Sequence, residues 1–417
     1  MKSVLRGVLP APLLALLLLA AFARPAAAED PPEDWKKQNE ELEGRVRSLE
    51  DERAARTSAD EEESLGLGIV LTRGKVRGTL QIFGDVGAQW QNPGNPDRGE
   101  TSFFLGGVNI FGTAQVGDHF HVLSETVIKT REDSSSDRVI FDQERLSAAW
   151  IFNDHLYVKL GLDHGPVSRW NHLFHHGRWL ETTIDRPLLA RFETSGGILP
   201  MHNTGLELGG RHLTDCGPIN YVFIVSNGRG RSAEDPQKIS DRNDDKALEL
   251  GIGFAPRAIE GLHVGIHVRY DELPSDSSVA ARMRPIVQII LGGHAEYRTG
   301  PWELFLEFVL IENDDRTSGS TFSHTSGYLQ AAYHVRERWT AYTRLDFRQM
   351  EAGDPYFMPL GRDLDRWEIV LGVRHELTNN AALKIEVSFG EFEQRATGGA
   401  VSDVWYTRFG IQVSWVF

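Results

Sequence analysis

The carboxyl-terminal stretch from Trp405 to Phe417 constrains the fold of this chain more than any other feature. In an extended strand, successive side chains point to opposite faces, so residues two apart share a face. The odd-numbered positions of this stretch are apolar or aromatic except for Thr407, whereas the even-numbered positions include Arg408, Gln412 and Ser414. Aromatic residues near both ends of an otherwise aliphatic face are typical of a strand that contacts lipid. We therefore predict a membrane-spanning strand here.

The stretch ends on Phe417, with no polar residue after it. A terminal phenylalanine preceded by apolar residues at every second position resembles the closing strand of bacterial outer-membrane β-barrels. In that family, the barrel assembly machinery recognises this strand. The resemblance implies that the protein lies in the outer membrane of a Gram-negative envelope, contacts lipid and the assembly machinery, and closes a barrel with this strand.

The first 28 residues have the order of a secretory signal peptide. Lys2 and Arg6 precede an apolar run over 8–21, and the small residues Ala26 to Ala28 precede Glu29. The apolar run is too short to span a bilayer comfortably, and no later stretch approaches the ~18 consecutive apolar residues of a membrane helix. We predict a signal peptide over 1–28 and exclude helical membrane spans from the rest of the chain.

Residues 29–64 are polar and charged, with apolar residues that begin at Trp35 and recur at heptad-like spacings. The same grid places Asn39 at a core position, where a buried Asn would fix the register of a coiled coil. The segment is interpreted as a short periplasmic coiled coil or, as the alternative, a solvated helical linker. Residues 65–75 are predicted to form a connector, and 76–417 the barrel.

The charge balance and cysteine content exclude several classes of protein. Without the three basic residues of the signal peptide, the chain carries 41 basic and 59 acidic residues, a formal charge of −18. No basic face offsets this charge, so we exclude nucleic-acid binding. The single cysteine, Cys216, excludes a disulfide-rich scaffold and is predicted to lie in a periplasmic turn.

From Val76 onward the sequence alternates with period two. We count about sixteen segments near the ~10 residues that a tilted membrane strand needs, and 14 to 18 fit the pattern. Short connections are predicted at 117–119, 153–155, 215–218, 336–338 and 378–380. Long connections are predicted at 91–101, 164–203, 228–246, 313–325, 350–365 and 391–403. Aromatic girdles are expected from the tryptophans at predicted strand ends, Trp150, Trp302, Trp339, Trp367, Trp405 and Trp415.

Long and short connections alternate in phase with the strands. Short periplasmic turns and long external loops produce this alternation in an outer-membrane barrel, whereas a soluble sandwich or propeller has no reason for it. The predicted fold is therefore all-β, a transmembrane antiparallel β-barrel of about 16 strands with both ends in the periplasm.

The loop over 164–203 is the longest and would be the third external loop. In this it resembles trimeric general porins, whose third loop folds inward and narrows the pore. The plan of signal peptide, short coiled coil and closed barrel also resembles the phosphate-selective porin family. Where that family has a Gly-Arg-Phe-Pro-Phe-Gly type stretch, this chain has Gly161-Leu162-Asp163-His164-Gly165-Pro166. The resemblance therefore implies a pore and a homotrimer, without phosphate selectivity.

Candidate lumen residues follow from the same alternation. Basic side chains on the later strands, facing carboxylates and imidazoles on the middle strands, would set an electric field across a pore. The alternative is an ordinary polar interior in which each charge is balanced locally. The predicted pore-lining residues are Arg344, Arg348, Arg374, Lys384, Arg408, Glu296, Glu303, Glu307, His263, His267 and Arg269, with His294 beside them.

The longest loop carries a second group of candidates. On a helix, His172 and His176 would share a face and could bind Zn²⁺ or Cu²⁺, but a loop that lines or plugs the lumen is the preferred interpretation. No metal site or cofactor is predicted. An acidic run at 241–245 would gather cations at the mouth or simply be solvated. The predicted constriction residues are His172, His175, His176, Arg178, Glu181, Asp185, Arg186 and Arg191.

These features favour a porin that allows passive diffusion of small hydrophilic solutes or ions through a charged lumen narrowed by the 164–203 loop. The alternative is a plugged structural barrel that tethers the envelope through its periplasmic coiled coil. The inward loop fits both, because it would constrict or occlude. Catalysis is not predicted, since the Ser, His and Asp residues form no spaced signature of a nucleophile and its base.

Overall fold

The computed structural model describes residues 68–417 except 96–98, 132–137, 175–176, 277–281 and 397–398. The predicted signal peptide and coiled coil lie outside the described residues, so both stay predictions. Within the described ranges, no helix is long and apolar enough to cross a membrane.

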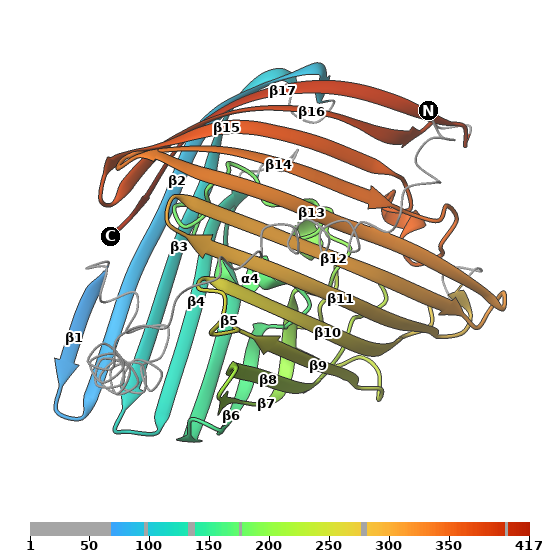
Figure 1. Ribbon diagram of the computed structural model, residues 1–417. Coiled ribbons are helices and arrows are strands. Elements are labelled where there is room, and N and C mark those ends of the chain that lie inside the picture. The colour runs from blue at the N-terminus through green and yellow to red at the C-terminus, as the bar shows by residue number, and fades with distance from the viewer. Residues whose placement is uncertain (1–67, 96–98, 132–137, 175–176, 277–281, 397–398) are drawn as a thin grey trace, which may run out of the picture. The chain divides into compact units, whose positions relative to one another are not determined.

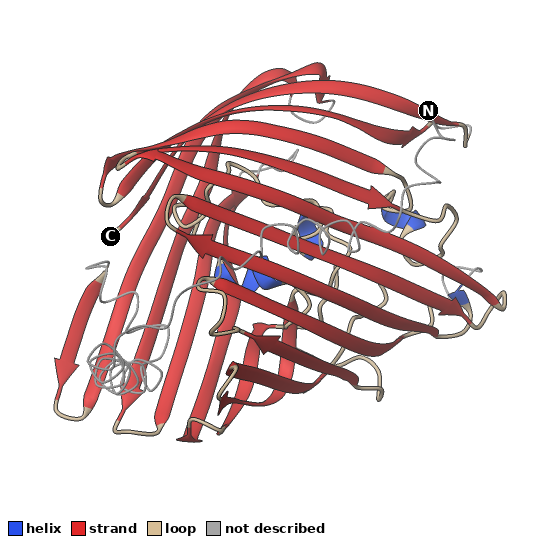
Figure 2. Cartoon of the chain, in the orientation of Figure 1, coloured by secondary structure: helices blue, strands red, loops and turns tan. Residues whose placement is uncertain are grey.

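Strands dominate the described part of the chain, and short helices occur only in its loops (Figures 1 and 2). The strands are β1 (Ile69–Arg73), β2 (Val76–Asn95), β3 (Gly99–Val116), β4 (Phe120–Arg131), β5 (Arg138–Asn153), β6 (Leu156–His164), β7 (His202–Thr214), β8 (Gly217–Ser226), β9 (Ala247–Phe254), β10 (Leu262–Leu273), β11 (Ile286–Thr299), β12 (Trp302–Asp315), β13 (Ser320–Arg336), β14 (Trp339–Gln349), β15 (Arg366–Thr378), β16 (Ala381–Arg395) and β17 (Val401–Val416). The helices are α4 (Arg169–Leu173), η2 (Glu193–Ser195) and η4 (Met358–Leu360).

Strands β2 to β17 form a closed antiparallel barrel of 16 strands, which confirms the predicted fold class. The closing ladder between β17 and β2 runs from Thr407 opposite Asn92 to Val416 opposite Phe83. Beyond it, the backbone N–H of Phe417 donates to the carbonyl of Ile82 at 3.0 Å, and the carbonyl of Phe417 accepts from the N–H of Ile82 at 2.9 Å. Closure pairs the backbone groups of the first and last barrel strands, which lipid could not satisfy.

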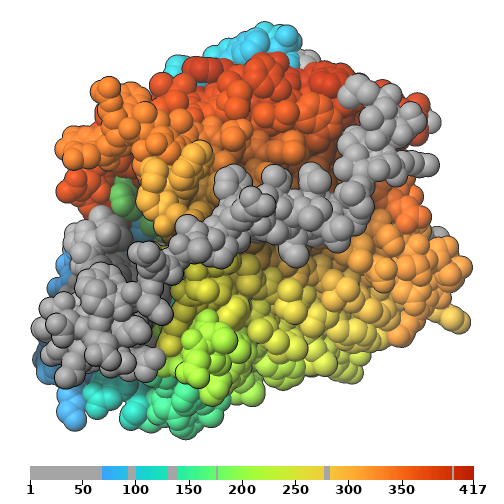
Figure 3. Space-filling model, viewed as in Figure 1, coloured from blue at the N-terminus to red at the C-terminus, as the bar shows by residue number. Residues whose placement is uncertain are grey.

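Side chains alternate between lipid and lumen as the period-two pattern predicts. In β17, Tyr406 and Val416 are 4% and 0% exposed, whereas Trp405 and Phe409 keep 56% and 45% of their surface. Glu249 of β9 is likewise buried between two exposed leucines. Exposed tryptophans on the outer surface include Trp150, Trp302, Trp339 and Trp405. In the space-filling view, the later strands cover the visible wall as adjoining bands of colour (Figure 3).

The predicted short turns at 117–119, 153–155, 215–218, 336–338 and 378–380 all lie between consecutive strands, as expected. Three predicted long loops are wrong in length. Most of 91–101 belongs to β2 and β3, 313–325 shrinks to a turn at 316–319, and 391–403 is mostly β16 and β17. The ladders continue past the point where apolar alternation ends, because backbone pairing does not require apolar side chains. The apolar alternation therefore predicted the lipid-facing belt, but it did not predict where the strands end.

Strand β1 falls in the span predicted as a connector. It forms a hairpin with β2, from Ile69 opposite Leu80 to Arg73 opposite Val76. The part of β2 that pairs with β1 runs from Val76 to Leu80. It precedes Phe83, where pairing with β17 begins, so β17 does not reach it. The connector prediction missed a strand because five residues are too few to show a clear alternation.

Candidate pore and inward-folded loop

The loop over 165–201 lies inside the barrel and packs against the inner faces of β10 to β13. Trp170 of α4 is completely buried, and its ring lies edge-on to those of Phe305 and Tyr328, at centroid distances of 6.1 and 5.8 Å. One apolar core fills this half of the lumen. Its loop members are Val167, Trp170, Phe174, Leu189, Ala190, Ile198, Leu199 and Met201, and its wall members include Ile286, Ile290, Phe305, Val309, Ile311 and Tyr328.

Helix α4 is held by one carboxylate of the wall. Glu307 of β12 accepts hydrogen bonds from the backbone N–H groups of Arg169 and Trp170, at 2.8 and 2.6 Å. The hydroxyl of Tyr328 donates to the same carboxylate at 2.7 Å. The Ser168 side chain caps the helix by accepting from the N–H of Asn171. Negative charge at a helix N-terminus is favourable, so Glu307 fixes where the loop enters the lumen.

Four basic side chains on β14 to β17 hold the second half of the loop, and we call Arg344, Arg374, Lys384 and Arg408 the basic clamp. Lys384 donates to the carbonyls of Arg178 and Thr183, at 2.6 and 3.0 Å. Arg374 donates to the carbonyls of Trp179 and Glu181, at 2.6 and 2.7 Å.

The other two members of the basic clamp also combine loop and wall contacts. Arg344 donates to the Thr183 hydroxyl and the Asp185 carbonyl, at 2.9 and 2.8 Å, and pairs with Asp346 of its own strand at 2.6 Å. Arg408 pairs with the Asp185 carboxylate at 2.8 Å. The basic clamp therefore holds the loop through hydrogen bonds and an ion pair.

The remaining predicted pore-lining residues also lie on inward positions of their strands. Arg348 donates to the Gly196 carbonyl at 3.4 Å, and Arg269 pairs with Glu249 and Asp271. Glu296 pairs with Arg169 and Arg298, Glu303 pairs with His334, and His263 meets His294. Most of these charges are balanced by a neighbour. That they line a conducting path stays a prediction.

The predicted constriction residues form their own buried network in the loop. Glu181 pairs with Arg178 and Arg186, at 2.8 and 3.1 Å. Burial lowers the pKa of Arg186 to about 10, and Glu181 opposes this shift. His172 of α4 is exposed, unlike its neighbours Asn171 and Phe174.

The remaining predicted constriction residues are His175, His176 and Arg191. His175 and His176 lie outside the described residues, so the pairing of His172 with His176 stays open. Arg191 lies just before η2, where burial and the charge of Arg366 lower its pKa to about 10. A constriction role for all eight residues stays a prediction.

A cavity of about 410 Å³ lies between part of the loop and the wall made by β2 to β5. Elsewhere the loop contacts this wall, because Trp179 and Leu180 pack in a cluster with Phe83 of β2 and Phe111 of β3. The lining of the cavity mixes charges of both signs with a few apolar groups. Loop 165–201 and the segment 227–246 form its other sides. The lining residues that carry charge are Asp85, Lys129, Asp142, Glu144, Arg178, Arg186, Glu193, Asp235, Lys238 and Arg242, with His202 beside them. The apolar core thus lies against β10 to β13, and the polar cavity lies along β2 to β5.

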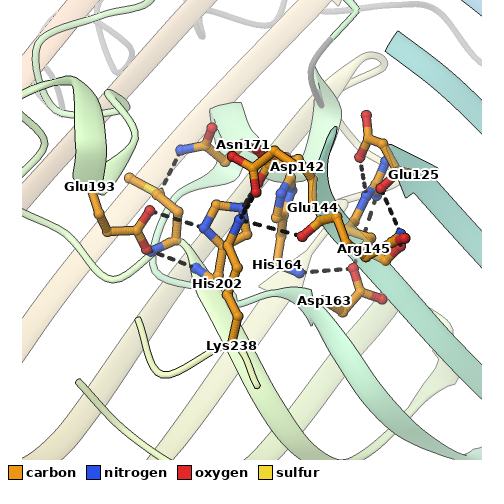
Figure 4. A network of polar contacts seen from close by, with 12 residues as sticks. Glu125, Asp142, Glu144, Arg145, Asp163, His164, Asn171, Glu193, His202 and Lys238 are labelled. Carbon is orange, nitrogen blue, oxygen red and sulfur yellow. Dashed lines mark hydrogen bonds and ion pairs between the residues drawn. The ribbon is translucent and has the colours of Figure 1, made fainter. Parts of the chain in front are cut away.

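A polar network joins the loop to the wall along one side of this cavity (Figure 4). His202 of β7 lies between Glu193 of the loop and Glu144 of β5, at 2.9 and 2.8 Å. Lys238 reaches Glu144 at 2.6 Å and Asp142 at 3.2 Å.

The network keeps its loop and segment members charged. Burial acts to raise the pKa of Glu193, but His202 outweighs this and lowers that pKa to about 2. Burial acts to lower the pKa of Lys238, but Glu144 outweighs it and the net shift is upward. Charged partners on both sides therefore hold the end of the loop against β5 and β7.

The period-two alternation did not predict this network. In β5, both Glu144 and Arg145 are buried, because the pairing with β4 shifts register between Glu125 and Thr126. A bulge of this kind breaks the period-two pattern from which lumen-facing residues were predicted. His202 falls inside the predicted loop over 164–203, and nothing in the sequence pairs it with Glu193.

Comparison with known proteins gives no match by sequence: no family model matches the chain, and neither does a curated protein. Solved structures do match. An anion-selective porin from Comamonas acidovorans superposes with a TM-score of 0.58 and 14% identity, covering 82% of this chain and 100% of that porin. OmpT, an outer membrane protein of Vibrio cholerae, gives a TM-score of 0.55 and 10% identity over 84% of this chain and 99% of its own.

The outer membrane channel DcaP of Acinetobacter baumannii gives a TM-score of 0.54 and 10% identity, covering 84% of this chain and 100% of that channel. At such identities the likeness concerns the fold. The chain has the barrel fold of outer-membrane porins, and its apolar outer belt is that of a protein of the outer membrane.

Proposed function

We propose that this protein is an outer-membrane porin through which small hydrophilic solutes or ions diffuse passively. The observation that carries the proposal is the charged cavity between the inward loop and the β2 to β5 wall. A barrel of 16 strands is wide enough to hold an aqueous channel. Here the apolar core holds one part of the loop against β10 to β13, and Trp179 and Leu180 hold another part against β2 and β3. Solutes would pass through the remaining cavity along β2 to β5.

The lining of this path supports hydrophilic solutes of either charge. Lys129 and Lys238 face the path beside Asp142 and Glu144, so neither sign dominates that wall. Charged side chains at a narrow zone replace part of the hydration of a passing ion. The proposal therefore includes weak charge selectivity set by the loop network, and no catalytic step.

Assembly and processing belong to the same proposal. A signal peptide over 1–28 would direct the chain to the envelope, and the barrel assembly machinery would insert it. A trimer is supported by the likeness to OmpT of Vibrio cholerae, whose solved forms include one described as a trimer, with a TM-score of 0.50 and 12% identity.

A second candidate is a plugged barrel that tethers envelope layers through residues 29–64. The depth of the loop core favours it, since Trp170, Leu189 and Leu199 are all completely buried. A loop fixed so firmly would occlude the lumen if the cavity did not continue to the periplasmic side.

Planar-bilayer recording of the purified full chain distinguishes the two candidates. A porin gives stepwise conductance, and deletion of residues 29–64 leaves the step size unchanged. A correctly folded barrel that stays silent, together with loss of envelope attachment on deletion of 29–64, would establish the plugged barrel instead. Heat-modifiable migration in gels, which reports barrel folding, is the control for every preparation.

A further inference from the structure

Three histidines form a cluster on the inner wall away from the cavity, and we call His263, His267 and His294 the imidazole cluster. The first two lie on β10 and the third on β11, within a ladder that pairs His263 with Glu296, Gly265 with His294 and His267 with Gly292. His294 is therefore the diagonal neighbour of both β10 histidines. A ring nitrogen of His294 lies 3.2 Å from Nδ1 of His263.

Glycines on the neighbouring strands make room for all three rings. A Cβ at Gly253 would overlap the ring of His263, one at Gly265 would overlap that of His294, and one at Gly292 would overlap that of His267. Each imidazole therefore lies along the wall over a residue without a side chain. The three glycines lie on the adjacent strands β9, β10 and β11, and each leaves space for one ring.

Several nitrogens of the cluster have no hydrogen-bond partner. His267 is 6% exposed, and both of its ring nitrogens are buried without a partner. The Nδ1 atom of His294 is also buried and unpartnered. A buried polar atom without a partner is unfavourable, so a ligand that bound one ring nitrogen of His267 would gain from it. His263 and His294 are only partly buried, which leaves the cluster within reach of solvent.

We propose that the imidazole cluster binds a borderline transition-metal ion such as Cu²⁺, Ni²⁺ or Zn²⁺. Two imidazole nitrogens that bind one ion at ~2.0–2.1 Å with a tetrahedral angle lie about 3.3 Å apart, close to the separation of His263 and His294. Each neutral ring binds through one nitrogen and keeps its proton on the other. The hydrogen bond between the two rings is exchanged for two bonds to the ion.

The third ligand requires a side-chain rotation. Among the described residues, no group of three His, Cys, Asp or Glu side chains is already arranged around one point. His267 reaches the ion by turning about its side-chain torsions, and it gives up no hydrogen bond in doing so. Water completes the coordination. Imidazole ligands suit Cu²⁺, Ni²⁺ and Zn²⁺, whereas Mg²⁺ and Ca²⁺ prefer oxygen, so the site selects by ligand type.

The positive charge of Arg169 acts against a cation at His263 and His294, and Glu296 offsets part of it at His263. Arg169 of α4 pairs with Glu296 at 3.1 Å, and Glu296 also accepts from Arg298 at 3.0 Å. These charges are compensated locally, and they remain in place when the ion binds.

Cu²⁺ titration of the untagged full chain in detergent tests the site, because Cu²⁺ has the highest affinity among these ions. The starting protein carries His172→Gln, His175→Gln and His176→Gln, which remove the three histidines in the sequence of the loop over 165–201. Calorimetry measures affinity and stoichiometry, and electron paramagnetic resonance detects nitrogen ligands. We expect about one equivalent bound with a nitrogen hyperfine pattern.

Three variants decide the assignment. His263→Gln with His294→Gln should weaken Cu²⁺ binding at least tenfold and remove the nitrogen pattern. Gly265→Ala keeps every imidazole but displaces the ring of His294, and it should weaken binding as well. His119→Gln with His375→Gln removes two histidines near the periplasmic turns and should change nothing.

Unchanged binding in the His263/His294 variant, or no saturable nitrogen-liganded Cu²⁺ in the starting protein, would overturn the assignment. Gel migration confirms that each variant is folded. The titration needs no conducting pore, so it is independent of the proposed transport function.

Discussion

Replacement of Lys384 by Met should release the inward loop without disturbing the barrel. Lys384 is fully buried and donates only to the carbonyls of Arg178 and Thr183, at 2.6 and 3.0 Å. Among the described residues it has no carboxylate within ion-pair distance. Methionine has a similar length and fills the same space, so the substitution removes the two contacts to the loop and leaves the wall intact.

The size of the effect follows from these two bonds. Hydrogen bonds from a charged donor contribute about 1.5–3 kcal/mol each. Part of this is offset, because the ammonium group no longer has to be buried. A net loss of about 3 kcal/mol in loop docking raises the population of open loop roughly a hundredfold.

Thiol labelling measures that population directly. In a Cys216→Ser background, a cysteine at Ala190, which is completely buried in the loop core, reacts with a maleimide only when the loop opens. Lys384→Met should raise the labelling rate by about two orders of magnitude. Lys75→Met removes the same charge from the β1–β2 turn and should leave the rate unchanged. Equal rates in Lys384→Met and its parent would refute the clamp.

Further predictions concern the other anchors of the loop. Trp170→Ala removes the largest buried side chain of the lumen core and should cost about 3–5 kcal/mol of loop docking, seen as faster labelling at position 190. Glu307→Gln weakens the acceptor for the N–H groups of Arg169 and Trp170 and should expose α4 to hydrogen exchange, with the strand amides unchanged. Glu193 has a folded pKa of about 2 against 4.5 when unfolded, so its stabilisation, about 3 kcal/mol, is complete above pH 4.5 and is lost as the pH falls toward 2. The thermal midpoints of Glu193→Gln and its parent should accordingly differ at pH 6 and converge near pH 2; a constant gap would contradict this pKa.

The wall of the barrel could be predicted from sequence because each strand shows the same alternation of apolar and polar side chains along its own residues. Lipid on one side and water or protein on the other impose an alternation that the stretch from Trp405 to Phe417 shows with Thr407 as its exception. The parity of short and long connections then places the loop over 164–203 on the external side. Strand ends were less accurate, since ladders run on through polar residues, as they do at 313–325.

The contents of the lumen could not be predicted in the same way. Arg344, Arg374, Lys384 and Arg408 were recognised as inward-facing, but their partners are carbonyls and side chains of a loop far away in sequence. Every residue has a backbone carbonyl, so the sequence does not indicate which carbonyl an inward-facing side chain will contact. The arginines were therefore interpreted as charges that set a field across a pore, whereas in the structure they hold the loop.

Current block by a thiol reagent tests most directly whether an aqueous path runs along the β2 to β5 wall. Val127 lines the cavity on β4, and the adjacent Ile128 occupies the opposite, lipid-facing register. In the Cys216→Ser background, a charged methanethiosulfonate should reduce the single-channel current of Val127→Cys and leave Ile128→Cys unchanged. A folded Val127→Cys barrel whose current is insensitive to the reagent, or that carries no current, would contradict a path along this wall.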